Sequence, residues 1–176
     1  MSTVRAAATS KPGSGPFIGS MSRSLWQWVR RQIYADVVAA GFTDLNPAHV
    51  ALFRNPTSEG RRPGDLADEM QITKQSVNEL LGHLERQGYL VREPDPIDNR
   101  SRRIRLTDLG HELEDTVWRA AASAERTAGD LLGEDRLQQL RQTLVDLVTL
   151  LGLSGDAAAP QAIPSPDRRE DTRQVE

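Results

Sequence analysis

Cysteine is absent from the 176 residues of this chain, and aromatic side chains are scarce at 5%. Without cysteine the protein has no disulfide, no thiolate ligand for zinc and no thiol redox switch. No apolar run approaches the roughly 20 residues that a helix needs to cross a bilayer. The first 20 residues hold no apolar core of signal-peptide length. We therefore expect a cytoplasmic protein with no membrane partner.

Signatures of catalysis and metal binding are also missing. The three histidines, His49, His83 and His111, have no paired spacing of the kind that binds zinc. The sequence has no glycine loop for cradling phosphate and no nucleophile elbow. We therefore expect no enzymatic activity, no metal site and no cofactor.

Both ends of the chain differ in composition from its middle. Residues 1–20 are rich in Ser, Gly, Ala and Pro, and residues 153–176 mix Pro, Ala and charged side chains. Neither stretch can bury enough apolar surface to offset the conformational entropy of ordering it. The composition predicts two disordered tails around one folded domain of residues 21–152.

Apolar residues recur at helical spacing on both sides of this domain. The pattern predicts helices over about 22–40, 107–132 and 134–152. The last helix carries a seam of Leu137, Leu140, Leu144, Leu147 or Val148, and Leu151. The seam either belongs to the core of one subunit or forms a dimer interface. Because so little else in the chain can cover it, we expect a helical dimerisation region.

The part between these helices, about 46–106, predicts a different architecture. Turn and capping residues divide it into a helix from Asn46-Pro47 to about 54, a short helix from 64 or 65 to 70, a longer helix over 73–87 and strands over 89–93 and 102–106. Two helices joined by a brief link and followed by a hairpin predict a winged helix-turn-helix. The expected fold class is mainly α with a small β-hairpin wing.

The helix over 73–87 is a candidate for contact with DNA bases. An apolar stripe of Val77, Leu80, Leu81 and Leu84 packs one side of it inward and leaves the other side for solvent. The outward side of its first turns carries Thr73, Lys74, Gln75, Ser76 and Asn78. Amides can read adenine, and lysine can reach guanine or a phosphate. The alternative is an ordinary exposed helix face, but the helix-turn-helix setting favours DNA contact.

The hairpin concentrates positive charge on a chain whose net charge is −3. Residues 86–105 contain six arginines and three acidic residues. Arg100, at the turn, can enter a narrow minor groove, where the negative potential is strongest. Arg102, Arg103 and Arg105 would then contact phosphates. A basic hairpin alone is often only a solvated surface, but its position directly after the helix-turn-helix favours a role in DNA binding.

Residues 65–110 resemble the DNA-binding core of the MarR family of bacterial transcriptional regulators. The most diagnostic pieces are LERQGYLVR, DPIDNRSRR and LTDLG. The resemblance implies a homodimer whose N- and C-terminal helices interlock. It also implies a wing Asp-x-Arg motif in which Asp98 orients the arginine that enters the minor groove, Arg100.

The family often binds a small anionic or aromatic effector between its dimerisation helices and its DNA-binding lobe. The residues that could line such a pocket here are Trp26, Tyr34, His49 and Trp118. The alternative for these side chains is packing in the core or at the dimer interface.

We expect a sequence-specific regulator that binds double-stranded DNA at a pseudopalindromic operator as a homodimer. Repression and release by a small effector are the expected mode of action. The alternative is a winged-helix protein-interaction module that does not bind DNA. The retained arginines of the hairpin favour DNA binding, because such modules usually lose the basic wing.

Overall fold

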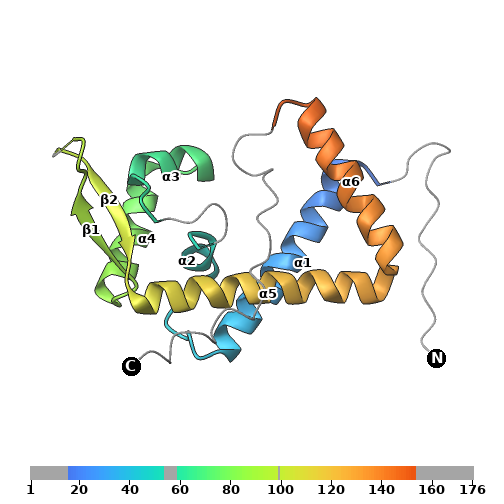
Figure 1. Cartoon of the computed structure of the whole chain (residues 1–176), viewed down its shortest axis with the longest axis horizontal. Coiled ribbons are helices and arrows are strands. Elements are labelled where there is room, and N and C mark those ends of the chain that lie inside the picture. Colours follow the sequence, from blue (N-terminus) through green and yellow to red (C-terminus); the bar gives the residue numbers. More distant parts are fainter. Residues whose placement is uncertain (1–15, 54–58, 99, 154–176) are drawn as a thin grey trace, which may run out of the picture.

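The computed structural model describes residues 16–53, 59–98 and 100–153. In chain order these residues form α1 (Ile18–Ala39), α2 (Pro47–Ala51), α3 (Pro63–Met70), α4 (Lys74–Arg86), β1 (Leu90–Pro94), β2 (Arg102–Leu106), α5 (Asp108–Leu132) and α6 (Glu134–Leu150). The described part is mainly helical with one antiparallel hairpin (Figure 1). This confirms the fold class expected from the sequence.

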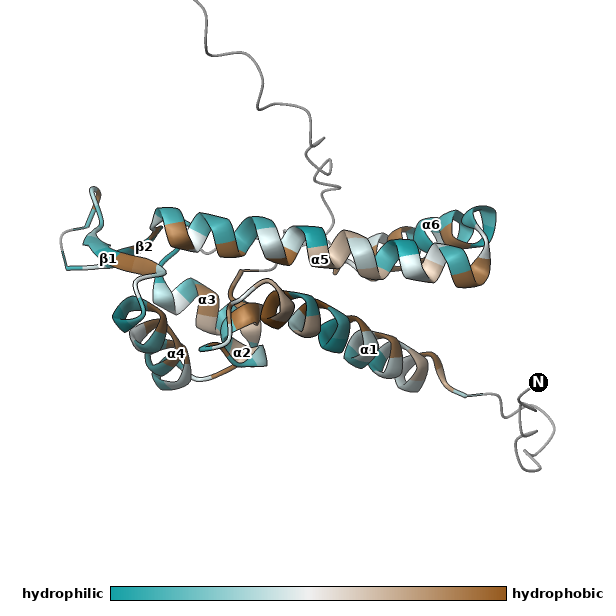
Figure 2. Cartoon of the chain, turned by 90° about the horizontal axis from the view of Figure 1, so that it is seen from below, coloured by the Kyte–Doolittle hydropathy of each residue, from teal (hydrophilic) through white to brown (hydrophobic). Residues whose placement is uncertain are grey.

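Helices α1 and α5 form the body of the molecule. α5 runs along its length, and α1 packs against it (Figure 2). The residues that these helices bury recur at helical spacing: Ile33 and Val37 in α1, and Leu113, Val117 and Ala120 in α5. Each of them is at most 3% exposed. Removing this stripe from water stabilises the pair by about 25 cal/mol for each Å² of apolar surface buried.

Helices α2, α3 and α4 and the hairpin gather at one end of α5 (Figure 1). α4 buries Val77, Leu81 and Leu84 completely, and its apolar stripe is the one that the sequence predicts. Between α3 and α4 the chain turns at Gln71, whose φ of 54° lies in the left-handed region. That conformation ends α3 and allows α4 to cross it sharply, as in a helix-turn-helix.

The hairpin is paired on both edges of its second strand. Across the hairpin, Leu90 of β1 lies opposite Leu106 of β2. On the outer edge, the Gly60 N–H donates to the Ile104 carbonyl at 2.7 Å, and the Ile104 N–H donates to the Arg61 carbonyl at 2.9 Å. These two bonds tie the hairpin to the segment that leads into α3.

The junction between the hairpin and α5 is tightly packed. Thr107 caps α5, because its Oγ1 accepts a hydrogen bond from the Gly110 N–H at 3.1 Å. The Thr107 N–H donates to the Tyr89 carbonyl, also at 3.1 Å. A Cβ atom at Gly110 would lie 2.0 Å from that same carbonyl oxygen. Glycine at this position therefore lets α5 start directly against the entrance to the hairpin.

The observed boundaries differ from the expected ones mainly at the N-terminus. α1 begins at Ile18 and not at about 22, because Ile18, Met21 and Leu25 continue its apolar stripe by a further turn. The expected tail boundary at residue 20 thus falls inside α1. Most of the two expected tails, 1–15 and 154–176, lies outside the described residues. The second helix, α2, ends at Ala51 and thus before the expected end at about 54. No helix in the described ranges is long and apolar enough to cross a membrane.

Candidate nucleic-acid interface

Helix α4 presents polar side chains to solvent along its first turns. Thr73 caps the helix through its Oγ1, which accepts from the Ser76 N–H at 3.1 Å. The two hydroxyl oxygens of these residues are 2.9 Å apart. Lys74, Gln75 and Asn78 are exposed, because the buried stripe holds the opposite side of α4 against the core. The face offered to solvent thus combines an ammonium group with two amides.

Both amides of this face already have partners on the protein. Gln75 Nε2 donates to Glu79 Oε1 at 3.0 Å. Asn78 Nδ2 donates to the Lys74 carbonyl at 2.9 Å, and Asn78 Oδ1 accepts from Arg92 at 3.2 Å. Arg92, which the sequence did not single out, comes from β1 and also forms an ion pair with a carboxylate of α4 at 2.7 Å. The hairpin therefore holds Asn78 more firmly than Gln75.

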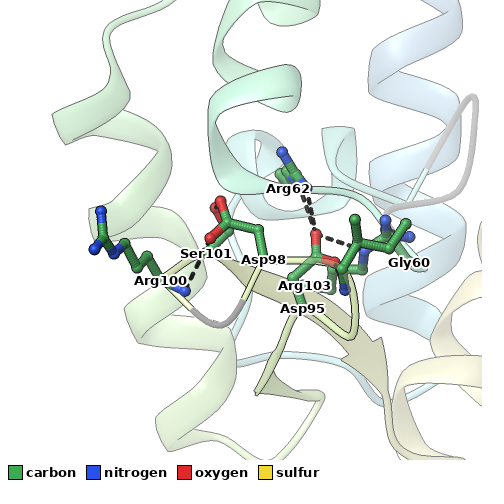
Figure 3. Close-up of polar contacts among 8 residues, drawn as sticks. Gly60, Arg62, Asp95, Asp98, Arg100, Ser101 and Arg103 are labelled. Atoms are coloured by element: carbon green, nitrogen blue, oxygen red, sulfur yellow. Dashed lines mark hydrogen bonds and ion pairs between the residues drawn. The ribbon is translucent and has the colours of Figure 1, made fainter.

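The turn of the hairpin is organised by Asp98. Its Oδ1 accepts from the Arg100 backbone N–H at 3.1 Å, and its Oδ2 accepts from the Ser101 hydroxyl at 2.7 Å. These two bonds, with that of Ser101 the larger cause, lower the pKa of Asp98. The side chain of Arg100 extends away from the hairpin (Figure 3). Asp98 thus positions the backbone of Arg100, and its described hydrogen bonds do not reach the guanidinium.

The remaining arginines of the hairpin separate into different environments. Arg102 is exposed at the start of β2. Arg105 forms a loose, solvent-exposed ion pair with Glu93 at 3.7 Å. Arg103 is partly exposed, and its Nε lies 2.9 Å from Asp95 Oδ2. Arg103 thus pairs with Asp95 while 37% of its side chain stays exposed, and the phosphate contact expected for it remains a prediction.

Asp95 is the part of the site that sequence reasoning missed. Its side chain is completely buried, and its Oδ2 accepts from Arg62 Nε at 2.7 Å. Its Oδ1 accepts from the Ile97 N–H at 2.8 Å. The contact with Arg103, then the bond from Ile97, hold the pKa of Asp95 well below its usual range. The sequence around it, Pro-Asp-Pro, indicated only a turn.

Comparison with known proteins identifies the family. A model of the MarR family matches residues 43–101. The transcriptional activatory protein BadR of Rhodopseudomonas palustris is 31% identical over 134 residues, which cover 70% of this chain and 74% of BadR. The chain belongs to the MarR family. It is therefore a transcriptional regulator, and its family consists of regulators and not of enzymes.

Solved structures agree with this MarR-family assignment at the level of the fold. The transcriptional repressor CouR, bound to a 23-mer DNA duplex, has a TM-score of 0.61 at 23% identity and covers 80% of this chain and 99% of its own. CouR from Rhodococcus jostii RHA1 bound to p-coumaroyl-CoA has a TM-score of 0.59 at 22% identity, covering 75% and 92%. These structures share the winged-helix architecture with this chain.

The four residues expected to line an effector pocket lie in different surroundings in this MarR-family chain. Tyr34 borders a space of only about 10 Å³ beneath α1, and its hydroxyl donates to the Leu45 carbonyl at 3.0 Å. His49 borders an open groove of about 670 Å³ between α2 and α4. Trp26 of α1 is exposed and Trp118 of α5 is half-buried, and neither lines either space.

The groove between α2 and α4 contains two stacked histidine rings. The centroids of His49 and His83 are 4.2 Å apart, and their planes differ by 8°. His49 Nδ1 accepts from the Asn46 N–H at 3.2 Å, while the Asn46 side chain accepts from the His49 N–H at 3.1 Å. This reciprocal pair caps α2. Burial, followed by the charge of His83, lowers the pKa of His49.

The depressed pKa of His49 predicts a loss of stability in mild acid. As pH falls below the ordinary value of 6.5, the unfolded chain takes up a proton at this residue before the folded protein does. The free energy of unfolding should therefore decrease between pH 7.5 and pH 5.5, measured by urea denaturation. His49→Gln, which keeps an acceptor for the cap, should flatten this dependence, whereas His111→Gln at an exposed position should not. Equal slopes in all three proteins would contradict the assignment.

Proposed function

We propose that this regulator binds a pseudopalindromic operator as a homodimer and represses transcription until a small effector releases it. The observation that carries the proposal is the exposed polar face of α4, which the hairpin contacts through Arg92 of β1 and Asn78. A major groove about 12 Å wide admits a helix such as α4. The turn that follows it in the chain then meets the flanking minor groove, where an arginine is favoured.

Within this proposal the DNA-contacting residues divide by chemistry. Gln75 and Asn78 are the candidates for reading bases, and Lys74 for guanine or phosphate. Thr73 and Ser76, at the start of α4, lie where backbone N–H groups can bind phosphate. Arg100 enters the minor groove, Asp98 sets its turn, and Arg102 meets the adjacent phosphates. Arg103 supports the hairpin from within.

A second copy of the chain is the proposed partner of the helical end. Helix α6 buries none of its side chains in the described structure. Its seam residues Leu140, Leu144 and Leu147 are 37–40% exposed, and Leu150 is 85% exposed. The first turns of α1 add further exposed apolar side chains, namely Phe17, Ile18, Met21, Leu25 and Trp26. Neighbouring exposed apolar side chains of this kind mark interaction surfaces. In a twofold dimer bound to DNA, the two α4 helices would lie about 34–36 Å apart.

Repression is proposed because a dimer with the proposed DNA-binding and dimerisation elements would occupy a promoter by binding alone. Similar proteins include both an activator and a repressor of transcription, since BadR is named an activatory protein and CouR a repressor. A promoter fusion with the regulator present and absent tests the direction. Higher expression in its absence supports repression, and lower expression would assign activation.

An aromatic or anionic effector is proposed for the groove between α2 and α4. CouR binds p-coumaroyl-CoA, and the groove here offers Arg86 together with the rings of His49 and His83. Its volume, about 670 Å³, is within the usual 300–1,000 Å³ of ligand sites. Titrating aromatic carboxylates into the protein–DNA complex should release the DNA.

Base reading by α4 is tested with Gln75→Ala and Asn78→Ala. A residue that reads a base should cost about 1–3 kcal/mol at one base position when it is removed. We expect the base-specific loss for Gln75, because Asn78 is held by Arg92. The measurement is binding to a set of operators that each differ at one position. A loss of equal size on every operator would reassign the residue to phosphate contact.

The salt dependence of DNA binding distinguishes the proposed function from the alternative, a winged-helix interaction module that does not bind DNA. Phosphate contacts release counterions, so the affinity for DNA should fall steeply as salt rises. A mobility-shift titration between 50 and about 200 mM salt measures this slope. Absence of DNA binding at low salt would favour the interaction module.

A further inference from the structure

The hairpin is joined to the helix-turn-helix by one buried carboxylate. Asp95, at the end of β1, is completely buried. Its Oδ2 contacts Arg62 Nε and one terminal nitrogen of Arg62, each at 2.7 Å, and Arg103 Nε at 2.9 Å. Arg62 is the N-cap residue of α3, and Arg103 lies on β2. A single oxygen therefore connects three elements of the DNA-binding lobe (Figure 3).

The same residue also closes the turn that carries Arg100. The Asp95 N–H donates to the Ser101 carbonyl at 3.0 Å, and its Oδ1 accepts from the Ile97 N–H at 2.8 Å. The turn is completed by the bond from the Ser101 N–H to the Asp98 carbonyl at 2.8 Å. Any rotation of the turn against α3 must therefore break contacts of Asp95.

We propose that Asp95 is a positioning residue for DNA recognition, which holds the hairpin turn at a fixed angle to the helix-turn-helix through Arg62. The inference rests on the proposed function, because it assumes that Arg100 contacts the minor groove beside the α4 half-site. We call the contacts of Asp95 with Arg62 and Arg103 the clamp. With the clamp in place, α4 and Arg100 reach the two grooves together. Without it, the turn samples several angles and the contact of Arg100 loses its fixed register.

The fold should survive loss of the clamp. The backbone bonds of Ile104 to Gly60 and Arg61 still attach β2 to the segment before α3. The side chains of Arg62 and Arg103 are 38% and 37% exposed, so both guanidiniums can turn toward water when Asp95 no longer accepts from them. Asp95→Asn is therefore a usable variant, and circular dichroism melts will verify that it folds.

An electrostatic role and a positioning role of Asp95 predict different results for Asp95→Asn. The substitution removes a buried negative charge from the lobe proposed to bind DNA and frees two arginines, so non-specific affinity should stay equal or rise. Positioning predicts that preference for the sequence flanking each half-site falls about fivefold or more, in the range of a lost groove contact. Glu93→Gln is the matched control: it removes the same charge from the same hairpin, where the pair with Arg105 is exposed. It should keep the flank preference.

The experiment compares full-length wild type, Asp95→Asn, Arg100→Ala and the double variant on operators that differ only in their flanks. If Asp95 acts through Arg100, the double variant will lose no more flank preference than Arg100→Ala alone. Additive losses, or an unchanged preference in Asp95→Asn while Arg100→Ala loses it, would overturn the inference. An unchanged preference in Arg100→Ala would instead overturn the proposed minor-groove contact.

A second variant keeps the test independent of the stability of the first. Arg62→Gln cuts the link to α3 but leaves Asp95 paired with Arg103. It should reduce flank preference in the same direction as Asp95→Asn. If Asp95→Asn fails to fold, unchanged flank preference in Arg62→Gln would still refute the clamp.

Discussion

Leu144→Glu is expected to convert the proposed dimer into a monomer and to weaken operator binding by roughly 100-fold or more, the scale set by losing one of two linked sites. Leu144 is 40% exposed in the single chain, so glutamate can remain in water there without disturbing the core. Between two subunits the same carboxylate would be buried without a partner, which is strongly unfavourable. Light scattering measures the mass, and titration with operator DNA measures the affinity.

The control for this substitution is Gln139→Glu on the same helix. Gln139 is exposed and lies off the leucine seam, so the variant adds the same charge outside the proposed interface. It should stay dimeric and bind DNA normally. A Leu144→Glu protein that remains dimeric with full affinity would place the dimer interface elsewhere.

The largest effect on folding is expected from Gly110→Ala. The new Cβ would lie 2.0 Å from the Tyr89 carbonyl oxygen and 3.2 Å from Leu106 Cβ. Both neighbours belong to the buried base of the hairpin, and the closer one is backbone, so relief requires α5 to move away from the hairpin. Overpacking of this kind costs about 3 kcal/mol or more. Chemical denaturation should show the loss as a lower midpoint.

Gly129→Ala on the same helix separates this clash from a general effect of alanine in α5. A Cβ at Gly129 would meet only the side-chain ends of Glu134 and Leu137, each at 3.4 Å. Alanine also favours a helix over glycine by about 1 kcal/mol, so this variant should be neutral or stabilised. Equal stability of the two variants would show that the junction at Gly110 tolerates a side chain.

Local signals in the sequence predicted the elements of this fold well. Thr73 and Thr107 each cap the helix that follows them, as their positions before apolar stripes indicate. The predicted stripe of Val77, Leu80, Leu81 and Leu84 indicates the outward side of α4 correctly, since these residues are fully or partly buried. These predictions succeed because capping and helical periodicity depend on residues only three or four positions apart.

Contacts between distant segments could not be predicted in this way. Arg62 and Asp95 are 33 positions apart, and nothing near either residue indicates the other. The pairing of Arg103 with Asp95 could not be predicted for the same reason, because strand alternation cannot reveal that a buried carboxylate lies beside the arginine. The stacking of His49 on His83 likewise depends on how α2 packs against α4. The DNA-contacting roles of Gln75, Asn78 and Arg100 remain predictions.

The most direct test of the proposed function is a hydroxyl-radical footprint on DNA selected by this protein from a random pool. A dimer with two α4 helices in successive major grooves predicts a twofold symmetric sequence whose half-sites are about 10–10.5 base pairs apart. It also predicts protection that extends into the minor groove beyond each half-site, where Arg100 is placed. An asymmetric footprint over one half-site, or a pool without sequence enrichment, would contradict the account.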